Sequence, residues 1–331
     1  MTTILRNTHV DVLLTDQAIA FARTKPSTAR RLIPFTPTDK QSNLYPVWGR
    51  GSFLRDDMRP KGRGDEAPIW RPDLSNVRYV IQPEHLKAQL IWDERDNAND
   101  PAQYERGHVL GLVGKSTYAE DRIFAATYML NTSWASSNRY VGVSSNPSGQ
   151  QFLSFAQSGS DPYGVIELGR AIVRTQTGGQ YEPNKLVVSP DVDRVLRTHP
   201  SIITRALAVV QGGGTIQGAV SRAQMAAVLG VDQYEVLDAS RATSVEGAAV
   251  TVSDLSSGTM VLAYLSDDMS DYAPSAARVY EWSQGRPDGA PGSIRRFKRP
   301  EKSCDEIQIE TAITCQITSD VSAVHFASCL A

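Results

Sequence analysis

The sequence is poor in cysteine and has no long apolar run, and each shortage excludes a class of protein. Only Cys304, Cys315 and Cys329 occur among 331 residues. Their odd number and wide spacing exclude both a disulfide framework and a cysteine metal site. No stretch approaches the roughly 20 apolar residues of a membrane-spanning helix, and the N-terminal segment carries acids where a signal peptide is apolar. We therefore expect a chain that is made and folded in a cytoplasm and contacts no membrane.

The motifs of common active sites are also missing. No Gly-x-Ser-x-Gly segment occurs, and the five histidines have no partner at metal-ligand spacing. Residues 114–117, Gly-Lys-Ser-Thr, resemble the end of a phosphate-binding loop, but Val109 stands where that motif needs its first glycine. We interpret the acidic cluster of Asp267, Asp268 and Asp271 as a solvated loop. The sequence thus predicts no catalytic residue, no cofactor and no metal site.

What is present is an average globular composition with an uneven distribution of charge. Hydrophobic residues make up 41% and charged residues 21%, as in a soluble protein of more than one average domain. Residues 1–65 hold eleven Lys and Arg against six Asp, and residues 286–302 hold six basic against two acidic side chains. Residues 231–271 hold eight acidic side chains against one basic. Such a chain can present a basic face to a polyanion.

The first 46 residues show no core-forming pattern. A short helix is predicted from Asp16, and basic sequence punctuated by proline follows it as far as Pro46. We expect this segment to be an arm that depends on another surface for its burial.

Residues 47–80 have the pattern of a long hairpin. Two strands of about 15 residues would reach about 50 Å. Because an isolated two-stranded ribbon is marginal in water, its apolar side chains need cover from another surface. The hairpin consists either of two strands of an ordinary sheet or of an arm on a neighbouring subunit, and the pattern leaves both open. The side chains in question are Trp48, Phe53, Leu54, Ile69 and Trp70.

The longest helical candidate spans residues 101–131. Pro101 suits a first helical turn after Asp100. Three glycines in the first half each weaken the helix by roughly 1 kcal/mol relative to alanine, so we expect that half to depend on tertiary packing. The residues expected in the core of the monomer are Val109, Val113, Ile123 and Leu130.

An α/β region and a long strand follow. Helices are predicted near residues 163–178, 189–200 and 221–230, with short strands near 185–190, 233–239 and 259–265. Apolar and polar side chains then alternate from residue 307 to 317, which predicts a single strand with one buried face. Cys315 falls on the apolar side of that strand and is interpreted as a small buried hydrophobe.

The order of these elements resembles the major capsid protein of tailed bacteriophages, which has the HK97-like fold. The segment YPVWGRGSFLRDD resembles the ascending strand of that family's extended loop, the E-loop, and DPAQYERGHVLGLVGKSTYAEDRIFAATYMLNTSW resembles its spine helix. The segment YEPNKLVVSPDVDRVLRTHPSI is similar to part of the axial domain. Residues 261–282 and 305–326 resemble the strands that return through the peripheral domain.

The resemblance implies an α+β fold and a division of the chain. An N-terminal arm with the start of the peripheral domain would cover residues 1–46, and the E-loop would cover 47–80. The peripheral domain would span 81–150, the axial domain 151–283, and returning strands of the peripheral domain 284–331.

The resemblance also implies a structural protein and not an enzyme. Its copies would assemble into pentamers and hexamers of an icosahedral shell around double-stranded DNA, in the cytoplasm of a bacterial host, and would end in the virion. A separate scaffolding protein, a portal and decoration proteins are possible partners. The E-loop side chains named above would contact a neighbouring subunit, because contacts between unlike surfaces place one arm on the next copy until the ring closes.

Two further expectations concern the arm and the loop. The basic residues Arg23, Lys25, Arg30 and Arg31 are candidates for the surface that faces DNA. Some relatives join an E-loop lysine covalently to an asparagine near the C-terminus. Here Lys61 could lie in the loop, but no asparagine follows Asn184. We therefore expect a non-covalent shell.

Three alternatives stay open at this point. A cellular protein compartment of the encapsulin type shares the fold and holds enzymes in place of DNA. A minor head or tail component is a second alternative. A soluble α/β enzyme that binds a nucleotide through residues 114–117 is the third.

Overall fold

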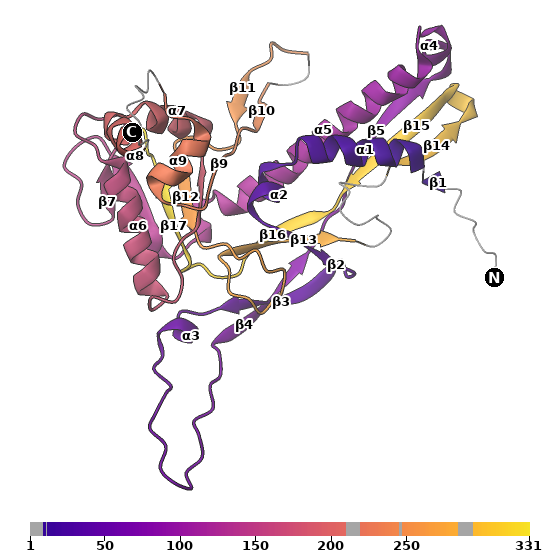
Figure 1. Cartoon of the computed structure of the whole chain (residues 1–331). Coiled ribbons are helices and arrows are strands. Elements are labelled where there is room, and N and C mark those ends of the chain that lie inside the picture. The colour runs from indigo at the N-terminus through magenta and orange to yellow at the C-terminus, as the bar shows by residue number, and fades with distance from the viewer. Residues whose placement is uncertain (1–8, 11, 210–218, 245–246, 284–293) are drawn as a thin grey trace.

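The computed structural model describes residues 9–10, 12–209, 219–244, 247–283 and 294–331. Figure 1 shows an elongated molecule in which a long helix and its sheet extend to one side and a helix-covered sheet lies at the other. A hairpin projects from the body between them. No helix among the described residues combines the length and the hydropathy that crossing a membrane requires.

The extended side is a four-stranded antiparallel sheet under two helices. The strand order is β1 (His9–Val10), β14 (Arg295–Arg299), β15 (Cys304–Thr311) and β5 (Glu84–Ile91). Helices α1 (Val12–Thr24) and α5 (Pro101–Tyr128) pack on one another and share a core with β5 and β15, and α4 (Trp92–Asn97) precedes α5. The core is apolar and includes Leu14, Leu90, Val109 and Ile307.

Helix α5 confirms the predicted spine helix. The Asp100 carboxylate accepts from the backbone N–H groups of Ala102 and Gln103, and the proline that follows lies in the first turn. Val109 and Val113 are buried as expected, and Ile123 is partly buried. Leu130 does not lie in the core, since the helix ends two residues before it and 49% of its surface is exposed.

The compact side is a six-stranded sheet whose two faces are both covered. Its order is β7 (Gln151–Leu153), β6 (Arg139–Val143), β17 (Ala323–Ala327), β12 (Met260–Ala263), β8 (Lys185–Val188) and β9 (Gln233–Val236). Helices α6 (Pro162–Gln176), α7 (Pro190–Thr198), α8 (Pro200–Val209) and α9 (Arg222–Leu229) contribute to the core on one face. The end of α5, through Phe124 and Tyr128, packs against the other face.

Two strands of this sheet, β6 and β17, come from segments that were expected in the peripheral domain. β17 pairs antiparallel with β12 and parallel with β6, so the C-terminal strand lies in the middle of the six-stranded sheet. The sequence placed it with the peripheral strands. The expectation differs because a short apolar strand carries no local signal of which sheet it joins.

The alternating segment 307–317 is not one strand. It is divided at Ala312 between β15 and β16 (Ile313–Ile317), and β16 belongs to a three-stranded sheet with β13 (Ala277–Trp282) and β2 (Phe35–Thr38). Cys315 is buried there opposite Val279, as its place in the alternation predicts.

The described part of the N-terminal segment is buried against the body of its own chain. Leu14 and Ala18 of α1 are buried in the core shared with α5. Ala29 and Leu32 of α2 (Thr28–Leu32) are fully buried in the core that contains the end of α5. The first helix begins at Val12, four residues earlier than predicted. The expectation of an uncovered arm is therefore wrong for the described part of residues 1–46.

Candidate assembly surface

The projecting hairpin is built on a short ribbon. β3 (Ser42–Trp48) pairs antiparallel with β4 (Leu74–Val80), in a register that sets Ser42 opposite Val80 and Trp48 opposite Leu74. Each strand has seven residues, so the predicted strands of about 15 residues are wrong. After α3 (Gly51–Leu54), residues 55–73 form neither helix nor strand, and we call them the distal loop. Its three prolines lack the N–H group that a strand ladder needs.

The base of the hairpin is fixed to the chain's own body. Trp48 and Phe53 stack with ring centroids 6.0 Å apart and pack against Val321, and they are only 7% and 5% exposed. The backbone N–H of Trp48 donates to the carbonyl of Thr318 over 2.8 Å, and Phe53 meets the edge of Tyr181. Segments distant in sequence therefore already cover Trp48 and Phe53 within the chain, and neither ring needs the cover from a neighbour that the sequence predicted.

A second aromatic group holds the hairpin's root. Tyr79 of β4 stacks on Tyr280 of β13 with ring centroids 4.5 Å apart. The ring centroid of Tyr45 of β3 lies 6.2 Å from that of Tyr79 and 6.0 Å from that of Tyr280. The Tyr45 hydroxyl donates to the side-chain carbonyl of Gln316 over 3.1 Å. The direction of the hairpin is thus set by its packing on the three-stranded sheet of β16, β13 and β2.

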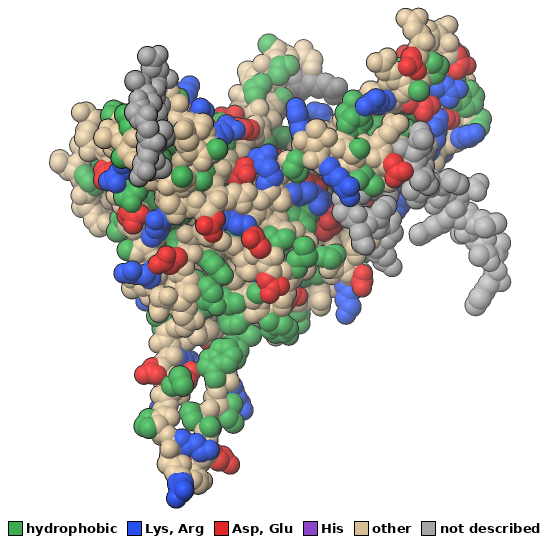
Figure 2. All heavy atoms as spheres, viewed as in Figure 1, with side chains coloured by type: hydrophobic (Ala, Val, Ile, Leu, Met, Phe, Trp, Pro, Cys, Tyr) green, Lys and Arg blue, Asp and Glu red, His purple; other side chains and the backbone are tan. Residues whose placement is uncertain are grey.

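The outer part of the hairpin stays uncovered in the single chain. Ile69 is 77% exposed and Trp70 57% exposed on the distal loop, and Leu54 at the end of α3 is exposed as well. Met58, which the sequence analysis did not single out, is 91% exposed on the same distal loop. Figure 2 shows hydrophobic side chains on both limbs of the projection. Large exposed apolar groups on a projecting loop mark a surface that binds another molecule.

The four basic candidates of the N-terminal segment differ in their surroundings. The Arg30 guanidinium donates to the carboxylates of Glu120 and Glu281 and lies over the ring of Phe35. Burial opposes its charge, but the two carboxylates outweigh burial and raise the pKa of Arg30. The charge of Arg30 is therefore paired within the chain, where it joins α2 to α5 and β13.

The other three basic residues lie at the surface. Arg31 is exposed and forms an ion pair with Glu235 at 2.9 Å. Arg23 and Lys25 are exposed near the end of α1. These two remain the candidates whose charge is most available to a polyanion.

Residues 114–117 lie inside α5, where a phosphate-binding loop cannot form. The Ser116 hydroxyl is buried and lies 2.6 Å from the Thr311 hydroxyl of β15. The nucleotide-binding interpretation is therefore wrong, because the backbone of this segment is helical. Among the described residues, no group of three His, Cys, Asp or Glu side chains could hold a metal ion.

No protein-family model matches the chain. Over 207 residues it is 23% identical to the major capsid protein of Burkholderia phage BcepMu, a match that covers 62% of this chain and 64% of that protein. The chain thus aligns with less than two thirds of the length of this curated relative.

Solved structures match over nearly the whole chain. A phage-related protein from Bordetella bronchiseptica RB50 has a TM-score of 0.71 at 16% identity, covering 97% of this chain and 98% of that one. The mature capsid of bacteriophage PhiM1 has a TM-score of 0.51 at 13% identity, covering 89% and 84%. An encapsulin complex from Synechococcus elongatus has a TM-score of 0.50 at 11% identity, covering 92% and 88%. At these identities the matches show the fold, which is the α+β, HK97-like fold of phage capsid structures.

Proposed function

We propose that this chain, which has the fold of phage capsid proteins, is the major capsid protein of a tailed bacteriophage. Its copies would form pentamers and hexamers of an icosahedral head shell around double-stranded DNA. The similarity to a phage major capsid protein supports this assignment. The observation that carries it is the distal loop, where Ile69 and Trp70 are exposed on a projection that its own body cannot cover.

The exposed side chains of the distal loop need cover from another copy of the chain. A contact between unlike surfaces repeats from one copy to the next until a ring closes. Each contact can be weak because several recur around each subunit, and weak contacts dissociate fast enough for misplaced subunits to leave. The rigid base around Trp48 and Phe53 supports this role, since it holds the loop away from its own chain.

Packaged DNA would be held by charge and not by sequence. Arg23 and Lys25 are the exposed candidates, and their attraction to phosphate should fall with rising salt. Truncation of residues 1–31 would be a poor test, because it removes the buried side chains of α1 and α2. Substitution of both residues by glutamine tests the charge alone, and full heads with the normal DNA content would contradict this role.

The shell would be non-covalent, because Lys61 has no asparagine partner after Asn184 in the sequence. The chain would catalyse no reaction. Assembly would take place in the cytoplasm of the bacterial host, with a scaffolding protein, portal and decoration proteins as further partners. Crosslinked ladders from mature particles in denaturing gels would contradict the non-covalent shell.

A cellular compartment of the encapsulin type is the second candidate, because an encapsulin complex shares the fold. The two functions differ in what the particles contain. Purified particles from the native source should hold nuclease-protected DNA if the chain builds a phage head. Particles that hold protein and no nucleic acid would favour the compartment.

Electron microscopy of the chain expressed alone tests the proposal directly. Shells, tubes or rings of five or six copies are expected. A monodisperse monomer at high concentration, with Trp70 protected from solvent, would contradict it.

A further inference from the structure

The chain has a second projection, a short ribbon of two strands. β10 (Ser240–Ala242) pairs antiparallel with β11 (Val252–Asp254), and Ala242 lies opposite Val252. We call these two strands the second ribbon. In Figure 1 the second ribbon extends from the body near β9, and the distal loop extends from the opposite side of the molecule.

One face of the second ribbon presents apolar side chains to water. Side chains alternate between the two faces of a strand, so Ala242, Val252 and Asp254 share a face. Val252 is 64% exposed, and Val250, two residues before it, is 73% exposed. An isolated two-stranded ribbon is marginal in water, and neighbouring exposed apolar groups mark a contact with another molecule.

The second ribbon is held at both ends by backbone hydrogen bonds. At its base the N–H of Leu255 donates to the carbonyl of Ala239 over 3.0 Å. Beyond the strands the N–H of Thr243 donates to the carbonyl of Thr251 over 2.8 Å, and the hydroxyls of these two threonines lie 2.9 Å apart. The apolar face is thus presented by a regular, paired backbone.

The ribbon of β3 and β4 carries a second uncovered face. Its inner face, with Tyr45 and Tyr79, packs on β13. By alternation, Leu44, Arg78 and Val80 lie on the other face, which we call the outer face. Leu44 is 57% exposed and Val80 50% exposed, so the outer face also presents apolar surface to water.

Charge and spacing match between the two faces. On β11, Val252 and the exposed Asp254 are two residues apart, which is about 7 Å along a strand. On β4, the exposed Arg78 and Val80 have the same separation. The Arg78 guanidinium donates to the Ser42 hydroxyl over 3.4 Å, so its charge lies along the outer face. A contact between the two opposite charges therefore brings the two valines together.

The second ribbon and the outer face of one chain cannot meet, because the two ribbons lie on opposite sides of the body. A contact between unlike surfaces that repeats from copy to copy closes a ring. In such a ring the side that carries β10 and β11 faces the side of the next copy that carries β3 and β4.

We infer that the second ribbon of one copy packs on the outer face of β3 and β4 in a second copy of this chain. Val252 lies on Val80 and Leu44. Asp254 pairs with Arg78. The inference rests on the proposed assembly of the chain, and it adds a contact that the distal loop does not make.

Engineered cysteines test the contact. The three native cysteines are buried, so they give no background in mild oxidation. The pair Val252→Cys and Val80→Cys should give a ladder of oligomers in non-reducing gels of oxidised particles, and reductant should collapse it. Val80→Cys alone should give no ladder.

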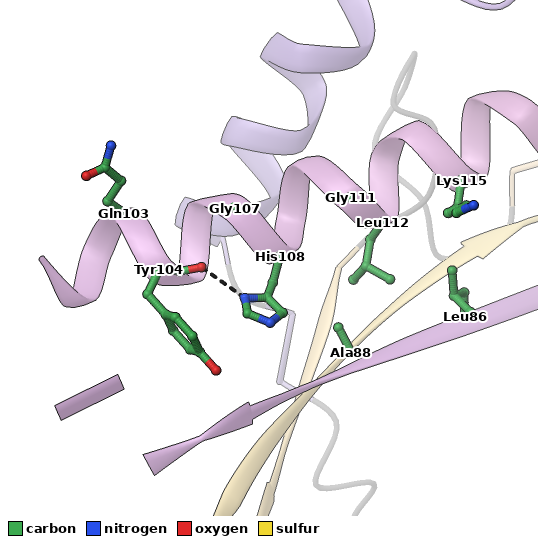
Figure 3. A pocket seen from close by; sticks show the side chains of 9 residues that line it. All are labelled: Leu86, Ala88, Gln103, Tyr104, Gly107, His108, Gly111, Leu112 and Lys115. Carbon is green, nitrogen blue, oxygen red and sulfur yellow. Dashed lines mark hydrogen bonds between the residues drawn. The ribbon is translucent and has the colours of Figure 1, made fainter. Parts of the chain in front are cut away.

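A matched control places the second cysteine on a different apolar surface. Figure 3 shows Leu86 of β5 in a groove beside α5, and this leucine is 45% exposed. The pair Val252→Cys and Leu86→Cys should give no ladder, although both positions are exposed. A ladder from this control pair overturns the stated contact. A dimer from Val252→Cys alone also overturns it, because two copies of the second ribbon would then pair with each other.

The crosslink separates this contact from the proposed function. Particles that assemble without the crosslink between positions 252 and 80 overturn the ribbon contact and leave the proposed function intact. An unaltered chain that stays monomeric overturns both.

A charge exchange tests the pairing independently. Asp254→Arg or Arg78→Asp alone should weaken assembly, measured by light scattering, by up to about fivefold per contact, the effect of an exposed ion pair. The double variant should recover the assembly of the unaltered chain at the same salt concentration. A double variant no better than the weaker single variant overturns the stated pairing.

Discussion

The guanidinium of Arg30 lies 2.7 Å from the carboxylate of Glu120, in the second half of α5. A second carboxylate, from Glu281 of β13, lies 2.8 Å from the same guanidinium, and the Ser27 hydroxyl donates to Glu120 over 2.6 Å. One cation thus joins α2, α5 and β13. This buried network fixes the N-terminal segment to the body of its own chain, and it leaves the hairpin as the part that reaches outward.

The first prediction concerns this ion pair. Arg30→Ala leaves Glu120 buried without its cation, and breaking a buried pair in this way costs about 3–5 kcal/mol. The free energy of unfolding, measured in urea, should fall by that order. Arg23→Ala, an exposed control on the same segment, should change it by less than about 0.5 kcal/mol. Equal effects of the two substitutions would contradict the structural role of Arg30.

The second prediction concerns pH. Burial raises the pKa of Asp121 to about 6, although the backbone N–H of Ala29 donates to this carboxylate. In the unfolded chain Asp121 has the ordinary, lower pKa of an aspartate. The protonated carboxyl therefore contributes stability to the folded chain below about pH 4, and this stability is lost as the pH rises through 6. Asp121→Asn should remove this loss, on the order of 2 kcal/mol between pH 4 and 7 in urea unfolding.

A second substitution at that position separates the charge from the hydrogen bond. Asp121→Ala also removes the acceptor for Ala29, so it should be less stable than Asp121→Asn at every pH. A pH profile of Asp121→Asn that matches the unaltered protein would show that this carboxyl does not titrate in the range.

The third prediction compares two tryptophans of one hairpin. Trp48→Ala should lower the free energy of unfolding by about 3–5 kcal/mol, because the ring is buried against Val321. Trp70→Ala should leave that free energy nearly unchanged and should reduce assembly, measured by light scattering. Loss of monomer stability in Trp70→Ala would mean that its own chain covers the ring.

The fourth prediction compares two glycines with different surroundings. Gly111→Ala in α5 should stabilise the monomer by up to about 1 kcal/mol, because its new methyl group meets nothing within 4 Å and alanine is the better helix former. As a control, Gly142→Ala should destabilise the monomer, since its Cβ would collide with the backbone of Ser328. Both effects are measured as the free energy of unfolding in urea. A loss of stability in Gly111→Ala would contradict the open surroundings of this glycine.

Local sequence signals were sufficient for many element boundaries. Asp100 and Pro101 begin α5 because a carboxylate side chain caps the free N–H groups of the first turn. Ser221 and Gln224 form a reciprocal capping box at α9, and Gly230 ends that helix in the left-handed conformation. Ser189 stands at the predicted cap position of α7, but its hydroxyl donates to the Asp191 carboxylate and accepts from the backbone N–H of Thr259, and it caps no amide of its own helix.

The burial of individual side chains did not follow from the sequence. Trp48 and Trp70 belong to one hairpin and have the same apolar character, yet only the first is covered, by Val321. The alternation through residue 317 predicted a buried face correctly and a continuous strand wrongly, because Ala312 stands where two sheets divide.

The sequence by itself determined the first turns of α5 and α9, the apolar faces of the strands, and the order of the elements along the chain. Those properties depend on residues within a few positions of each other. Only the tertiary structure decided that Arg30 pairs with Glu120, that β17 lies among the strands of the compact sheet, and that Trp70 stays uncovered. Each of these depends on groups far apart in sequence, whose approach is set by the packing of the whole chain.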